Sequence, residues 1–134
     1  MSGLYDKGRQ KILEGSIHWL SDTIKVQFID TADYSADLAA HEFLSDLPSA
    51  ARVGTPQTLV NKTSTGGVAD ADDSTFPALT GDSVEAILLY RQGSGESDSP
   101  LLAYIDSGSG LPFTPNGGDV VIIWPSGASK IFKL

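Results

Sequence analysis

Apolar and polar residues alternate along several stretches of the chain, and this period of two is typical of β-strands with one buried face. The clearest stretch is DTIKVQFID. Its residues Ile24, Val26 and Phe28 are predicted to face inward, and Lys25 and Gln27 are predicted to face outward. A strand is therefore expected over residues 22–30.

Further strands are expected where short apolar runs lie between turn residues. These runs are QTLVNKTST, VADA, DSTFPAL, DSVEAILLYRQ and LLAYID, in chain order. In DSTFPAL, Pro77 favours a position at a sheet edge, because proline has no N–H to donate. Beyond a loop rich in glycine and proline, residues 119–124 are predicted to form a closing hairpin with residues 130–134.

Two segments have helical rather than strand patterning. Residues 4–14 are predicted to form one short amphipathic helix, with Gly15 well placed to end it. Residues 37–47 are expected to form one or two short helical turns that end at Pro48. They belong to a long segment, residues 31–54, that crosses between two strands.

Three strands are apolar at consecutive positions: AILLY, LLAYI and DVVIIW. A continuous apolar run indicates that both faces of the strand are covered. One face would carry Ile87, Leu89, Val121 and Ile123. We expect the N-terminal helix, the segment over residues 33–48 or a neighbouring subunit to cover this face, with the subunit favoured. Self-association is therefore expected.

About seven strands, two short helical pieces and no regular alternation of strand and helix favour a mainly β fold. The expected architecture is an antiparallel β-sandwich or a partly closed barrel with a short N-terminal helix. A chain of 134 residues is most simply one domain. Within it we expect residues 1–15 to form an N-terminal arm or helix and residues 16–134 to form the β domain.

Composition narrows the possible functions. The chain has no cysteine, so disulfides and thiolate chemistry are excluded. Its formal net charge of −8 opposes binding to a nucleic-acid backbone, and no apolar run reaches the roughly 20 residues that span a bilayer. The N-terminal residues lack the apolar core of a signal peptide. We expect synthesis and retention in a cytoplasm, with no nucleic-acid or membrane partner.

Catalytic and metal-binding patterns are weak. The acidic run containing Asp70, Asp72 and Asp73 lacks the glycine and glutamate positions of an EF-hand loop, so it is interpreted as a solvated turn. His18 and His41 lie outside any zinc-ligand spacing. The letters GSGES precede a strand where a nucleophile elbow needs a helix. No enzyme activity, cofactor or metal is expected. Scattered aromatic residues leave a sugar-binding platform as an open alternative.

The most specific stretches of the chain are DTADY, residues 30–34, with the following FLSDLP, and the ending GLPFTPNGGDVVIIWPSGASKIFKL. In these stretches, and from Leu4 to Leu134 as a whole, the chain resembles a set of small virion proteins of tailed bacteriophages. Some members are described as minor tail components, and others are similar to cement, or decoration, proteins of the capsid. The family has no catalytic motif, so the resemblance implies no active site.

The resemblance implies a cement protein that oligomerises on the outer capsid surface of the virion and stabilises the head shell. Its partners would be the major capsid protein and other copies of itself, with a trimer favoured by analogy. Under this interpretation Tyr5, Lys7, Arg9 and Lys11 are candidates for a capsid-contacting arm. A helix packed on its own domain is an equal alternative for that segment. The competing function is a minor tail protein that contacts a receptor or glycan.

Overall fold

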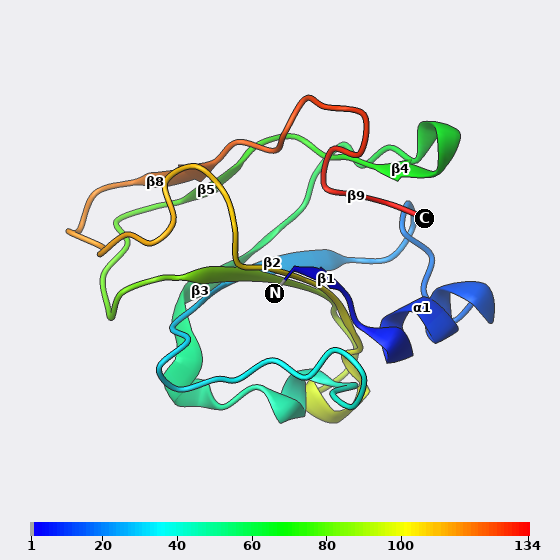
Figure 1. Cartoon of the computed structure of the whole chain (residues 1–134), viewed down its shortest axis with the longest axis horizontal. Helices are drawn as coiled ribbons and strands as arrows, with labels where there is room; N and C mark the ends of the chain where they lie inside the picture. The colour runs from blue at the N-terminus through cyan, green and yellow to red at the C-terminus, as the bar shows by residue number, and fades with distance from the viewer. Residues whose placement is uncertain (1) are drawn as a thin grey trace.

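The computed structural model describes residues 2–134, which form three layers (Figure 1). A five-stranded antiparallel sheet lies in the middle, with strand order β1-β7-β6-β2-β3. Its strands are β1 (Gly3–Leu4), β2 (Ile24–Ile29), β3 (Arg52–Thr58), β6 (Ala86–Arg91) and β7 (Leu101–Ile105). The expected fold class, a mainly β sandwich with a short N-terminal helix, is confirmed. The sandwich stays open rather than closing into a barrel.

Two short ribbons form the layer on one face of this sheet. They pair β5 (Ser74–Phe76) with β8 (Val120–Ile122), and β4 (Val68–Ala69) with β9 (Phe132–Lys133). The predicted closing hairpin is therefore wrong. Its two arms do fold as strands, but each pairs with an earlier segment, because Ser74 lies opposite Ile122 and Ala69 lies opposite Phe132.

Residues 31–51 form the layer on the opposite face (Figure 1). This segment is mostly irregular and contains two single-turn helices, η1 (Leu44–Asp46) and η2 (Ser49–Ala51). Two more such turns, η3 (Thr65–Gly67) and η4 (Glu96–Asp98), lie elsewhere in the chain. The expected helical turns therefore occur, but most of the segment covers the sheet through side chains rather than as a helix.

Arg52 anchors the irregular layer to the sheet. Its guanidinium donates hydrogen bonds to the carbonyl oxygens of Leu44 and Leu47, at 3.1 and 2.7 Å, and forms a bidentate ion pair with Glu96 at 2.9 Å. The Arg52 side chain is largely buried. One cation on an edge strand thus bonds two backbone carbonyls of the irregular segment and a carboxylate of η4.

The three layers enclose two separate cores. Strand β6 contributes to both, since Leu88 packs toward residues 31–51 and Leu89 packs toward the two ribbons. Both side chains are fully buried within one chain. The expectation that a neighbouring subunit covers Ile87 and Leu89 is therefore wrong: Ile87 is only 8% exposed, and the chain's own ribbons cover this face.

Two details of the strand predictions differ from the structure. Gln27 was expected to face outward but is buried, because its side-chain amide donates hydrogen bonds to the carbonyl oxygens of Val53 and Gly54, at 3.0 and 3.1 Å. The strand predicted over residues 57–65 lies earlier in the chain, at β3. A glycine and a proline within β3 interrupt the alternation of apolar and polar residues there. An edge strand tolerates both residues, and β3 lies at the edge of the sheet.

Helix α1 (Asp6–Leu13) lies against β7 and belongs to the same packed body as the sheet. It ends where expected, with Gly15 at a positive φ of 76°. Strand β1, immediately before the helix, pairs with β7, and Tyr5 is completely buried. Residues 2–15 therefore form a short strand and a helix packed on the domain, which is the second of the two alternatives given for this segment, and not a free arm.

Candidate binding groove

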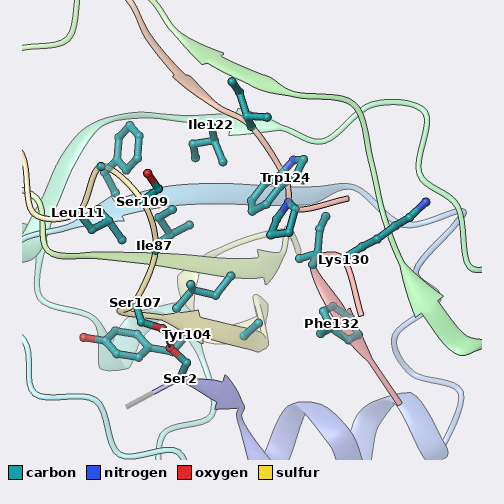
Figure 2. Close-up of a pocket in the computed structure, with 18 of the residues that line it drawn as sticks. Ser2, Ile87, Tyr104, Ser107, Ser109, Leu111, Ile122, Trp124, Lys130 and Phe132 are labelled. Atoms are coloured by element: carbon teal, nitrogen blue, oxygen red, sulfur yellow. Dashed lines mark hydrogen bonds between the residues drawn. The ribbon is translucent and has the colours of Figure 1, made fainter. Parts of the chain in front are cut away.

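A groove of about 770 Å³ opens between the central sheet and the ribbons (Figure 2). We call it the interlayer groove. Its sheet side includes Leu4, Phe28, Ile87 and Ala103, and its ribbon side includes residues 120–125 and 130–133. The glycine-rich loop after β7, residues 107–111, borders one end. The ribbons are only two or three residues long, so they cover only part of the sheet, and the groove lies over the part that they leave open.

The walls of the groove are mostly apolar, with polar groups at its borders. Ile122 and Trp124 approach from the ribbon, and Ile87 from the sheet, while Ser2, Ser107 and Ser109 bring hydroxyl groups to the side near the loop (Figure 2). The charged side chains in the lining are Arg9, Lys130 and Lys133. No carboxylate lines the groove among the described residues, although the chain as a whole carries a net charge of −8.

The outer face of β8 is the part of the predicted apolar face that this chain leaves uncovered. Val121 is 49% exposed and Ile123 is 75% exposed, whereas Ile122 and Trp124, at alternate positions, are buried. The apolar run at the end of the chain therefore has one face in the core and one at the surface. A partner surface at Val121 and Ile123 stays a prediction.

The candidate capsid-contact residues separate into one buried side chain and three on the surface of α1. Tyr5 is completely buried, so the prediction that it contacts another protein is wrong. Arg9 lies 3.6 Å from Asp6, and Lys11 lies 3.8 Å from Glu42 and over the ring of Phe43. Lys7 is half-buried. Contact between these three cations and a capsid stays a prediction.

The acidic run that contains Asp70, Asp72 and Asp73 lies between β4 and β5 and has structural partners. Asp70 forms an ion pair with Lys130 at 3.1 Å, Asp72 accepts a 2.6 Å hydrogen bond from Asn61, and Asp73 accepts a 3.4 Å bond from the backbone N–H of Trp124. These bonds hold the ribbon and its neighbouring turns together. The three carboxylates are thus used singly and do not converge on one point.

A different group of carboxylates does converge. Oxygen atoms of Asp30, Asp33 and Asp82 lie within 4.8 Å of one another, and this is the geometry among the described residues that comes nearest to a cation site. Asp30 is buried and accepts a 3.0 Å hydrogen bond from the backbone N–H of Ala32. The sequence spacing gave no signal for this group, because Asp82 comes from a separate loop.

The aromatic side chains do not form an exposed platform. Each of the aromatic residues among residues 2–134 is buried or half-buried, including Trp19, whose indole donates a 2.9 Å hydrogen bond to the carbonyl of Thr63. A sugar-stacking surface needs an exposed ring face. The geometry therefore gives no support to the glycan-binding alternative.

Three side chains form a hydrogen-bonded chain beneath the sheet. The Tyr5 and Tyr34 hydroxyls lie 2.9 Å apart, and the Tyr34 hydroxyl lies 2.8 Å from Nδ1 of His41. Burial raises the pKa of both tyrosines, so both stay neutral. The backbone N–H of Asp37 also donates to His41 Nδ1, at 3.2 Å, which makes that nitrogen an acceptor. The chain fixes residues 34–41 to the sheet.

Replacing Tyr34 with phenylalanine tests this arrangement. Tyr34→Phe removes the partner of the buried Tyr5 hydroxyl, so we expect a loss of about 2 kcal/mol in the free energy of unfolding. Tyr5→Phe is the matched control with a smaller expected loss, because Tyr34 keeps His41 as its partner. Urea denaturation measures both. An equal or larger loss in Tyr5→Phe would contradict the proposed order of hydrogen bonds.

Neither a protein-family model nor a curated protein matches this sequence. No helix among residues 2–134 is long and apolar enough to cross a membrane. The function proposed below therefore depends on the residues, the surface they form and the sequence resemblance described above.

Proposed function

We propose that the protein is a bacteriophage capsid cement protein that binds the outer surface of the head shell and stabilises it. The observation that carries the proposal is the pair of exposed apolar side chains Val121, in β8, and Ile123, directly after it, beside an open groove. Exposed apolar side chains next to a concave apolar surface are typical of sites that bind another protein. The resemblance to phage virion proteins suggests that this partner is the major capsid protein.

In this account the two-core domain acts as a rigid clamp between neighbouring shell subunits. Its fold is stabilised within one chain, because both faces of the central sheet are covered by the chain's own segments. The remaining exposed apolar residues are then available for the shell and for other copies of the protein. A trimer on the shell would grip several equivalent sites at once, and such multivalency strengthens weak individual contacts.

Copy number tests the proposal. Quantitative mass spectrometry of purified virions is expected to find the protein at a molar amount comparable to that of the major capsid protein, because a cement protein occupies repeated sites on the shell. A content closer to that of single tail components would favour the minor tail protein. Absence from purified virions would overturn both functions.

A further inference from the structure

Strand β8 has a pairing partner on one side only. It pairs with β5 in a two-stranded ribbon, and its other edge borders the interlayer groove. All six residues from 120 to 125 line the groove. Because successive side chains of a strand point to opposite faces, contact of the groove with Val120, Val121 and Ile122 in turn is what a cavity beside the free backbone edge of β8 would give.

The backbone along this edge is available for pairing. Outside the pairing with β5, residues 120–123 make no backbone hydrogen bond within the described part of the chain. An unpaired strand edge presents a row of N–H and C=O groups that readily accepts another strand. The pairing is short, so an added strand would extend a two-stranded ribbon into a more stable three-stranded one.

The side chains around the groove determine what such a strand should carry. An added strand would direct alternate side chains toward the partly buried Ile105, Leu111 and Phe113, which favours apolar residues at those positions. Of the three cations in the lining, Arg9 and Lys130 have carboxylate partners, Asp6 and Asp70, outside it.

Lys133 is exposed and has no ion-pair partner within residues 2–134. With no carboxylate in the lining, the groove is complementary to an acidic segment.

We propose that the interlayer groove binds an extended segment of a partner protein, with alternating apolar and acidic residues, as an added strand on β8. A second copy of this chain is a poorer occupant. Its exposed acidic loop, residues 94–98, contains no apolar side chain to fill the groove. The proposal does not depend on where the protein acts, so it can be tested without a virion.

The probe is a capped synthetic heptapeptide with the alternating sequence Val-Glu-Val-Glu-Val-Glu-Val. NMR titration of the full chain is expected to show saturable shifts in the backbone amides of β8 and in the indole of Trp124. The same peptide with lysine in place of glutamate is expected to bind at least about tenfold more weakly. A third peptide with a central proline, which cannot complete the strand pairing, is expected to lose binding.

Charge reversal on the protein supplies the matched control. Lys133→Glu is expected to weaken binding of the glutamate peptide and strengthen binding of the lysine peptide. Lys7→Glu makes the same charge change on α1, outside the groove, and is expected to leave the ratio of the two affinities close to that of the unsubstituted protein.

Three outcomes would overturn the proposal. The first is no saturable binding of the glutamate peptide. The second is equal binding of the glutamate, lysine and proline peptides, which would indicate unspecific apolar contact. The third is a dimer in sedimentation in which the β8 amides that do not bond to β5 are protected from hydrogen exchange before any peptide is added, since a second copy would then occupy the groove.

Discussion

Leu88→Ala and Leu89→Ala are each expected to lower the free energy of unfolding by about 3 kcal/mol, and the melting temperature by roughly 10 °C. The two leucines are neighbours on β6, are fully buried and belong to different cores. Since this chain covers both side chains, each truncation removes packing inside the monomer. Calorimetry measures both losses.

The concentration dependence of these losses separates an intramolecular core from a subunit interface. If the chain alone covers Leu89, the loss in Leu89→Ala stays the same across a hundredfold dilution, because no association step is involved. Val121→Ala is the control at an exposed position of the same sandwich, with an expected change within about 0.5 kcal/mol. A loss in Leu89→Ala that depends on protein concentration would contradict the two-core description.

Gly8→Ala is expected to destabilise the protein by about 2 kcal/mol, although alanine is the better helix former by about 1 kcal/mol. A Cβ atom at position 8 would lie 2.4 Å from the carbonyl oxygen of Leu101 and 3.3 Å from the Cα of Leu102. Both atoms belong to the backbone of β7, so the contact is relieved only by moving α1 away from the sheet. Thermal denaturation measures the loss.

Gly127→Ala is the matched control for this substitution. A Cβ atom at position 127 would meet no atom within 4 Å, so we expect little change in stability. Hydrogen exchange adds a local measurement, because displacement of α1 should expose the N–H of Tyr5, which donates to the carbonyl of Leu102 at 2.9 Å. A Gly8→Ala protein more stable than the original would show that α1 is not closely packed on β7.

Elements with a strong local pattern could be predicted from the sequence. The alternation in β2 and the apolar run of β6 were sufficient for strands, and the run in β6 correctly indicated two covered faces. The prediction that Ile87 and Leu89 share one face was also correct, since both belong to one core, while Ala86, Leu88 and Tyr90 belong to the other. These features depend on the period of side chains along one strand, which is a local property.

Pairing partners and the covering of β6 could not be predicted, because they depend on contacts between distant segments. The turn at residues 125–129 is compatible with a hairpin, yet β8 pairs with β5 and β9 pairs with β4. The segment over residues 31–51 has too few periodic apolar residues to be recognised as a layer. It buries Tyr34, Leu44 and Leu47 at irregular spacings.

The interlayer groove could not be predicted from sequence patterns either. Its lining combines residues of β2, β6 and β7 with segments near both ends of the chain and a glycine-rich loop, which had only indicated a turn. The apolar run at residues 120–124 was the one available signal, since it raised the question of what covers its second face. The structure gives a divided answer: Ile122 and Trp124 are covered by the chain itself, and Val121 and Ile123 remain exposed.

Cryo-electron microscopy of the purified virion tests the proposed function most directly. The account predicts density for this three-layered domain at repeated positions on the outer head shell, with the face that carries Val121 and Ile123 covered by a neighbouring subunit. Density confined to the tail or neck, or a shell without this domain, would contradict it.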